Sequence, residues 1–313
     1  MLVLIGGIGR VQIAELEKIE DTGNTMQKLK LRTALGKHAH IKPLRDGRVS
    51  SNRIEFDWVD MDPLPRAFRQ MVRGNDLDLS EMAIVTHLMA HHFAKPIIGL
   101  AIPLWWRLPH ANLVCEASGQ VIGPKDLENQ KVGVRAYSQT SGVWVRGILQ
   151  HAYGVNLDSI TWGTMEDSHL SEYIDPEICV RYPAQPSLRQ LMLEGEFSAI
   201  MGERIVDPSC VRTVIPNATK AARAWIADSG ITPVNHCVTL HTDLVATHDW
   251  LPAELMALFV KARAVAIEQD GAEAPPVFGL EHNMASLQCA FDFSYEQKIT
   301  PRRYTADELF LPL

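Results

Sequence analysis

The sequence predicts an α/β protein of two lobes, in which mixed sheets are flanked by helices and a cleft lies between the lobes. The chain has 313 residues, enough for two domains of about 150 residues each. Short apolar or alternating segments recur with helical patterns between them, which is typical of α/β sheets. A last strand and a long helix then return to the first lobe, so the second lobe interrupts the first.

The first lobe is predicted to open with a strand, and its second strand follows a turn at residues 46–48. A later helix has an apolar stripe and stops before Pro96. In chain order, the predicted elements are strands at 29–35 and 54–59, a helix at 65–73, a short strand that runs into a helix from residue 77, and strands at 96–103 and 112–115.

The second lobe alternates strands and helices in the same way, and one of its helices has Ser187 as N-cap and Gly195 as C-cap. Residues 174–186 carry three prolines and are predicted to form a loop. The elements are strands at 131–135, 160–164 and 197–201 and helices at 142–151 and 188–194, before a strand at 235–240 and a helix at 252–268. We expect an N-terminal extension at 1–26, lobe 1 at 27–118 with 235–313, and lobe 2 at 119–234.

The composition excludes several classes of protein. Hydrophobic residues make up 46% of the chain and charged residues 21%, which excludes disorder as the main state. No apolar run approaches the roughly 18 residues of a membrane-spanning helix. A net charge of −7 gives no basic field that would gather nucleic acid. We therefore expect a small-molecule ligand, and the sequence leaves the oligomeric state, including a homo-oligomer, open.

The cysteines and the first residues indicate a cytoplasmic protein. Five cysteines without a C-x-x-C pair argue for reduced thiols. Residues 1–8 are apolar but lack the basic segment and the small-residue cleavage site of a secretory signal. Residues 1–25 are equally consistent with a native segment and with an extension from an upstream start.

The most informative segment runs from the end of one predicted strand into a helix. Arg135 ends the strand, and the polar residues that follow precede a helix whose free N–H groups and positive dipole end favour an anion. Arginine also offers a planar fork that matches a carboxylate. We expect an anion-binding cradle, although Thr140 or Ser141 acting as a simple helix cap is an alternative. The cradle residues are Tyr137, Ser138, Gln139, Thr140 and Ser141.

Several histidines follow predicted strands, where a general acid or base is commonly found. They are His38, His40, His169 and His236, and histidine titrates near neutral pH. A surface or structural role is an alternative for each. Imidazoles with Asp167 or Glu172 could also hold a divalent metal, but no tight ligand motif is present. A solvated helix face explains His87, His91 and His92.

Other catalytic signatures are absent from the sequence. There is no G-x-S-x-G elbow, no P-loop and no G-x-G-x-x-G after a strand. The glycine run at 6–9 imitates the last of these, but it lacks the helix register and the acidic residue that should follow. No cofactor is required by the sequence.

The chain resembles the 4,5-dihydroxyphthalate decarboxylase family, whose fold is like that of type II periplasmic binding proteins. The resemblance covers about residues 28–250 and is carried by Leu-Arg-Thr-Ala-Leu-Gly at 31–36, Asp-Gly-Arg-Val at 46–49, Ser-Glu-Met-Ala-Ile-Val-Thr at 80–86, the segment 133–149, Glu-Asp-Ser-His at 166–169 and Asn-His at 235–236. It implies non-oxidative removal of one carboxylate from 4,5-dihydroxyphthalate to give protocatechuate and CO2 in phthalate degradation.

Such a reaction needs a cationic clamp, a proton donor over the ring and a group that recognises the catechol. We expect Arg135 and the cradle to be the clamp, His169 or His236 to donate the proton, and His40 and Glu81 to recognise the catechol. Ser80 and Asp167 are further candidates for substrate binding. Two alternatives remain: a solute-binding protein that serves a transporter of aromatic or organic acids, and a lyase of this fold that acts on another hydroxylated acid.

Overall fold

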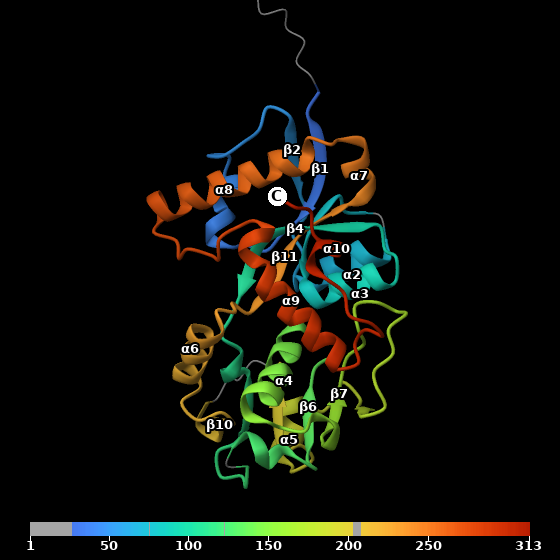
Figure 1. The fold of residues 1–313 in the computed structure, drawn as a ribbon, viewed down its shortest axis with the longest axis vertical. Coiled ribbons are helices and arrows are strands. Elements are labelled where there is room, and N and C mark those ends of the chain that lie inside the picture. Colours follow the sequence, from blue (N-terminus) through green and yellow to red (C-terminus); the bar gives the residue numbers. More distant parts are fainter. Residues whose placement is uncertain (1–26, 75, 122, 203–207) are drawn as a thin grey trace, which may run out of the picture.

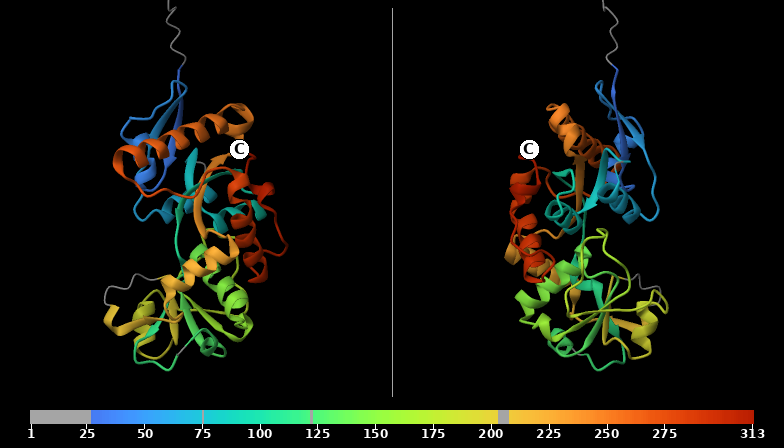
Figure 2. Two further views of the ribbon diagram at one scale, coloured as in Figure 1. Left: turned by 60° about the vertical axis from the view of Figure 1, so that its left-hand side comes forward. Right: turned by 90° about the vertical axis from the view of Figure 1, so that its right-hand side faces the viewer.

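The structure, a computed structural model, has two lobes joined at a narrow waist, which appear as the upper and lower halves of Figure 1. Two further views show the same separation (Figure 2). Each lobe is built on one mixed sheet with helices against it, so the predicted fold class is confirmed. The structure describes residues 27–74, 76–121, 123–202 and 208–313, and the predicted extension and its glycine run lie outside these residues.

The sheet of the upper lobe has the strand order β2-β1-β3-β11-β4. The first three of these run parallel, and β11 is antiparallel to both β3 and β4. Alternating side chains point to opposite faces, so α1 and α8 cover one apolar face while α2, α3, α9 and α10 cover the other. The bounds are β1 Leu29–Ala34, α1 Lys42–Arg45, β2 Ile54–Trp58, α2 Pro65–Arg73, β3 Leu79–Ala83, α3 Ile84–His92, β4 Ile97–Trp106, β11 Val234–His241, α7 Thr242–Thr247, α8 Leu251–Asp270, α9 Leu280–Glu296 and α10 Ala306–Leu309.

The sheet of the lower lobe has the strand order β10-β5-β9-β6-β7-β8. Strands β9, β6, β7 and β8 are parallel, with β8 at the edge, and β5 is antiparallel to β9 and β10. The bounds are β5 Leu113–Glu116, β6 Lys131–Val134, α4 Thr140–Tyr153, β7 Thr161–Thr164, β8 Cys179–Arg181, α5 Leu188–Leu193, β9 Ala199–Met201, β10 Val211–Thr213 and α6 Ala218–Ser229.

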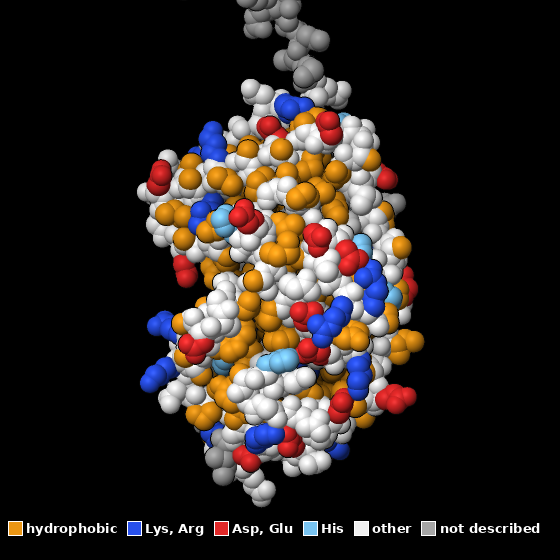
Figure 3. Space-filling model, viewed as in Figure 1, with side chains coloured by type: hydrophobic (Ala, Val, Ile, Leu, Met, Phe, Trp, Pro, Cys, Tyr) orange, Lys and Arg blue, Asp and Glu red, His pale blue; other side chains and the backbone are white. Residues whose placement is uncertain are grey.

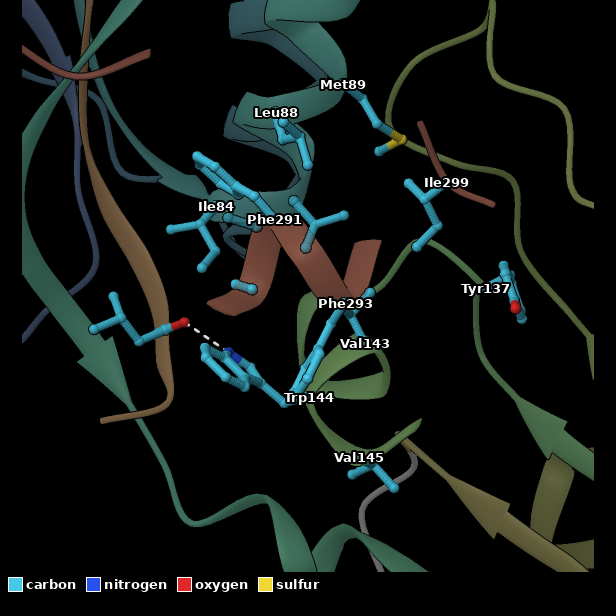
Figure 4. Packing of buried hydrophobic residues seen from close by; sticks show 14 of the residues in the cluster. Ile84, Leu88, Met89, Tyr137, Val143, Trp144, Val145, Phe291, Phe293 and Ile299 are labelled. Atoms are coloured by element: carbon cyan, nitrogen blue, oxygen red, sulfur yellow. Dashed lines mark hydrogen bonds between the residues drawn. The ribbon is translucent and has the colours of Figure 1, made fainter. Parts of the chain in front are cut away.

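Helix α9 joins the two lobes, because it packs on α3 of the upper lobe and on α4 of the lower lobe. Figure 4 shows the apolar contact at this waist, where Phe293 of α9 lies against Trp144 of α4. The indole Nε1 of Trp144 donates a hydrogen bond of 2.9 Å to the carbonyl of Val234, at the start of β11. The core is therefore continuous across the waist.

The structure differs from the sequence prediction in several places. Strand β5 pairs with β9 and β10, so it belongs to the lower sheet and not to the lobe that was predicted to end at residue 118. The predicted loop 174–186 contains the short strand β8, and α6 and α9 were not predicted. His87 is 1% exposed and lies near the carbonyl of Leu309, because α10 covers the face of α3 that was predicted to be solvated.

One face of the molecule carries no large field of one sign. Figure 3 shows acidic and basic side chains interspersed over one face of the molecule. Within the described part of the chain, no helix combines the length and the apolar character needed to cross a bilayer.

Candidate active site between the lobes

A cavity of about 770 Å³ lies between the lobes, where several strands end and two helices begin. The upper lobe lines it with the loop after β1, the start of α2, the junction of β3 and α3, and the end of β4. The lower lobe contributes the loop after β6, the start of α4 and the loop after β7. Clefts at the ends of strands in such sheets are common ligand sites.

The centre of the upper wall is Glu81, a carboxylate on β3 that is completely buried. Its Oε2 lies 2.8 Å from Nε2 of His38 and accepts a 2.8 Å hydrogen bond from the backbone N–H of Gly36. Its Oε1 lies 2.6 Å from Nδ1 of His236. One carboxylate therefore orients two imidazoles that both line the cavity.

The charge of Glu81 is held by these partners. Burial alone would raise the pKa of its carboxyl, but the hydrogen bonds from His236 and His38 outweigh it and hold the pKa well below the ordinary range. Glu81 is consequently ionised, and both imidazoles donate to it. Because Nδ1 of His236 is used in this bond, Nε2 is the ring nitrogen that remains for a ligand.

Aromatic side chains surround His236 and give this part of the cavity an apolar wall. The ring of Phe68 lies edge-on to His236 at 5.0 Å between centroids, and it also lies edge-on to His169 at 5.5 Å. Trp105 lies 4.7 Å from His236 between ring centroids. Flat apolar surfaces of this kind suit an aromatic ligand.

His169 enters the same cavity from the lower lobe but has a different environment. Its Nδ1 lies 2.8 Å from the hydroxyl of Thr86 on α3. Burial, followed by the positive charges of Arg69 and Arg135, lowers the pKa of His169 to about 3. The ring is therefore neutral at pH 7, which makes it a poor source of a proton.

Two arginines bring positive charge to the cavity from different segments. Arg135 follows β6, and its Nε lies 3.6 Å from Oε1 of Glu166 without a hydrogen-bond partner. Arg107 follows β4, donates to Oδ1 of Asn112, and its guanidinium lies 5.3 Å from the centroid of the Trp105 ring. Burial lowers the pKa of Arg107, yet an arginine remains charged at neutral pH.

The first turns of α3 and α4 also meet at the cavity. Thr140, the first residue of α4, accepts a 3.3 Å hydrogen bond through its Oγ1 from the backbone N–H of Val85 in α3. Gln139, Thr140 and Ser141 line the cavity with Thr86. Two helix dipoles thus point their positive ends at one space, which favours an anion.

Seven of the predicted site residues lie in the cavity wall. They are Glu81, Arg135, Gln139, Thr140, Ser141, His169 and His236. Their positions agree with a common site, while the role of each remains a prediction.

The other five predicted site residues do not line this cavity. His40 stacks on His38, with 5.4 Å between ring centroids. His38 therefore lines the cavity where His40 was expected to do so. Ser80 is buried in the sheet and donates to the carbonyl of Glu81. Tyr137 is buried against Arg146 beneath α4. Ser138 bonds to Ser168, and Asp167 is exposed and paired with Arg181 at 2.8 Å.

The structure adds Phe68, Trp105, Arg107, Asn112 and Asn235 to the cavity wall. Asn235 had a sequence signal, as part of the Asn-His block at 235–236. The run Trp-Trp-Arg at 105–107 was also visible, but β4 continues further than the predicted strand and carries it to the cavity.

A metal site is not formed by the residues proposed for it. Among the described residues, no group of three or more His, Cys, Asp or Glu side chains is arranged to hold a metal ion. Glu172 pairs with Lys95, and Asp167 pairs with Arg181. The imidazoles of the cavity contact Glu81 and Thr86 instead.

Comparison with known proteins gives sequence relatives and a shared fold. The chain is 28% identical over 257 residues to a 4,5-dihydroxyphthalate decarboxylase of Comamonas testosteroni, covering 77% of each protein. It is 26% identical over 193 residues to a protein of the same name from Pseudomonas putida, covering 59% of this chain and 74% of that protein. These relatives confirm the family resemblance. No family model matches the chain.

Among solved structures, the periplasmic aliphatic sulphonate binding protein SsuA from Escherichia coli has the same fold. Its TM-score is 0.58 at 15% sequence identity, and the match covers 91% of this chain and 92% of that one. At this identity the likeness concerns the fold alone.

Proposed function

We propose that this chain, a sequence relative of the 4,5-dihydroxyphthalate decarboxylases, is a carboxy-lyase that acts on a dihydroxylated aromatic dicarboxylate. The first candidate reaction converts 4,5-dihydroxyphthalate to protocatechuate and CO2. The names of both relatives support it. The observation that carries it is the ionised, buried Glu81 between two imidazoles, in a cavity that also has two arginines.

Binding of a dianion to an acidic protein requires local positive charge. Arg107 and Arg135 supply it from different segments of the wall, and the first turns of α3 and α4 add N–H groups. The carboxylate that stays on the ring would pair with one of these cationic groups. Phe68 and Trp105 would contact the ring faces and exclude water, which strengthens each of these electrostatic contacts.

The proton that replaces CO2 would come from His236. Ionised Glu81 at Nδ1 fixes the ring and balances the charge of a protonated imidazole, so Nε2 can give its proton to the ring carbon that bears the leaving carboxylate. His169 is a weaker candidate, because its lowered pKa of about 3 keeps it neutral.

The bonds and charges of the step balance without an oxidant. The hydroxyl para to the leaving carboxylate donates electron density to that carbon, which takes one proton and becomes tetrahedral. The bond to the carboxylate then breaks, its electron pair restores the aromatic ring, and CO2 departs. One proton is consumed for each CO2, so His236 must be protonated again from solvent before the next turnover.

The environment proposed for this activity is the cytoplasm, with a small aromatic carboxylate as the partner. The five cysteines all lie in described residues, and no disulfide joins them. Reduced thiols support a reducing compartment.

The test is to incubate the purified chain with 4,5-dihydroxyphthalate and to measure CO2 and protocatechuate, with and without a chelator. Equal amounts of both products, unchanged by the chelator, are expected. Tight binding without turnover would favour the solute-binding alternative, with which the shared fold of a sulphonate binding protein is also consistent. Turnover of other hydroxylated acids alone would assign a different lyase substrate.

A further inference from the structure

Four residues that line the cavity each carry a buried side-chain polar atom with no hydrogen-bond partner among the described residues. Two are donors, Nδ2 of Asn112 and Nε of Arg135. Two are acceptors, Oε1 of Gln139 and Oδ1 of Asn235. Buried polar groups are nearly always paired in folded proteins, so a set of unpaired ones in a cavity indicates what a ligand must supply.

Of the two acceptor residues, Asn235 is more deeply buried than Gln139, with 1% of its surface exposed. Its Nδ2 donates a 3.2 Å hydrogen bond to the carbonyl of Pro233. This bond fixes which way the amide is turned, so the acceptor Oδ1 is the free end. The side chain is thus held in place before a ligand arrives.

The irregular pairing of β11 explains how Asn235 reaches the cavity beside His236. Neighbouring residues of a regular strand point to opposite faces. Here the register between β11 and β4 shifts between Val234 and His236 and again between His236 and Cys237. Irregular pairing of this kind changes the direction of side chains locally, and both Asn235 and His236 line the cavity.

We propose that Asn235 determines specificity for a ring hydroxyl, with its Oδ1 accepting the hydroxyl O–H, while Nδ2 of Asn112 donates to a carboxylate. This inference rests on the proposed function and refines it. Asn235 then takes the role in catechol recognition that was expected of His40 and Glu81. His40 does not line the cavity, and both oxygens of Glu81 are already engaged by histidines.

The hydrogen-bonding groups of the substrate require that one residue accepts from the hydroxyl and another donates to the carboxylate. An ionised carboxylate only accepts hydrogen bonds, so it cannot satisfy Oδ1 of Asn235. A phenolic hydroxyl can donate to it. A phthalate without ring hydroxyls would leave this buried acceptor unpaired, and sites built around a substrate hydroxyl reject analogues that lack it.

The test compares the affinity for 4,5-dihydroxyphthalate with that for phthalate, measured by titration calorimetry on the full chain carrying His236→Gln, so that the first ligand is bound without being converted. The readout is the ratio of the two dissociation constants, because general damage to the cavity cancels in it. Asn235→Leu should reduce the preference for the dihydroxylated ligand by about tenfold or more. Asn112→Leu, the matched control, should weaken both ligands equally and leave the ratio unchanged, since both ligands carry the carboxylates.

Asn235→Ala serves as the second variant in case the larger leucine disturbs folding, which circular dichroism would reveal. A ratio within twofold of that of the His236→Gln parent in the folded Asn235 variants would overturn the inference. So would an equal change of the ratio in Asn112→Leu. Wild-type protein that binds the dihydroxylated ligand without releasing CO2 would count against the proposed function alone, because the binding ratio can still be measured.

Discussion

His236 and His169 are the same residue type in one cavity, and their surroundings give them different chemistry. His236 contacts an ionised carboxylate through Nδ1, whereas His169 contacts the hydroxyl of Thr86 and lies near arginines. The carboxylate of Glu81 accepts a hydrogen bond from the ring of His236, whereas burial and nearby guanidinium groups lower the pKa of His169. The structure thus distinguishes two histidines that the sequence left equivalent.

Replacing His236 tests this distinction. His236→Gln should lower kcat by about 10²- to 10⁴-fold, the usual contribution of a general acid, while the affinity for the substrate changes little. His169→Gln should have a much smaller effect on kcat. His282→Gln, at an exposed histidine of α9, is the control and should match the wild type. Steady-state kinetics would contradict the assignment if the two cavity variants lost activity equally.

His40 makes the stability of the protein depend on pH. Burial, followed by the nearby His38, lowers its pKa from 6.5 to about 4 in the folded protein. The unfolded chain therefore binds a proton first as the pH falls below 6.5, and the free energy of unfolding decreases between pH 6.5 and 4. At pH 5 this loss is on the order of 2 kcal/mol relative to pH 7.5.

Urea denaturation at pH 7.5 and pH 5.0 measures this dependence. His40→Phe cannot take up the proton, so its free energy of unfolding should fall less between the two pH values than that of the wild type. Equal decreases in the two proteins would exclude His40 as a contributor.

The sequence predicted the titratable and charged residues of the site better than the uncharged residues that line the cavity. Glu81, Arg135, His169 and His236 were predicted because acid, base and anion-binding groups are few and stand at strand or helix ends. Asn235 could not be assigned a role in the same way. Its position depends on the shifted register of β11, which no pattern in the sequence encodes.

At the scale of elements, the site is assembled by the ends of strands and the loops that follow them. Gly36, in the loop after β1, allows His38 to approach Glu81. A Cβ atom at this position would lie 2.6 Å from Nε2 of His38 and 3.0 Å from Oε2 of Glu81. No side chain fits between the imidazole and the carboxylate, so the glycine is required by space and not by backbone conformation.

Gly36→Ala should therefore displace His38 and lower kcat/KM by about tenfold or more, because small displacements at a reacting site have large effects. Gly123→Ala is a matched control. A Cβ there would meet nothing within 4 Å, and its backbone is extended. The free energy of unfolding of the control should change by less than about 0.5 kcal/mol. Wild-type kcat/KM in Gly36→Ala would show that the contact between His38 and Glu81 is dispensable.

Elements with strong local signals were predicted closely, and those defined by packing were not. Helix α2 has the predicted bounds, since Pro65 starts it and Gly74 follows its last residue. Strand β8 has three residues in a segment rich in proline, and it forms because β7 pairs with it. Such pairing lies outside the reach of local sequence patterns.

At the scale of the whole molecule, the segment after α9 fixes the lower lobe to the C-terminal part of the chain. Arg146 of α4 is completely buried, and its Nε donates a 2.7 Å hydrogen bond to Oε1 of Gln297. Nε2 of Gln297 donates a 2.9 Å hydrogen bond to the carbonyl of Val143. This pair of bonds maintains the wall opposite Glu81, because α4 carries Thr140 and Ser141 into the cavity.

Gln297→Ala should decrease the free energy of unfolding by about 3 kcal/mol, since it removes an acceptor from a buried guanidinium. Gln190→Ala, at an exposed glutamine of α5, should change it by less than about 0.5 kcal/mol. Urea denaturation at pH 7.5 measures both variants. Equal stability of the two would mean that Arg146 does not depend on Gln297.

The reaction proposed for this cavity replaces a ring carboxylate with a proton. The most direct measurement is turnover of 4,5-dihydroxyphthalate in D₂O, with the products analysed by mass spectrometry and NMR. We expect one CO2 per protocatechuate and one deuterium at the ring carbon that lost the carboxylate, with this product absent from His236→Gln on the same time scale. Recovery of the bound dicarboxylate intact, with no CO2 and no deuterated ring, would contradict it.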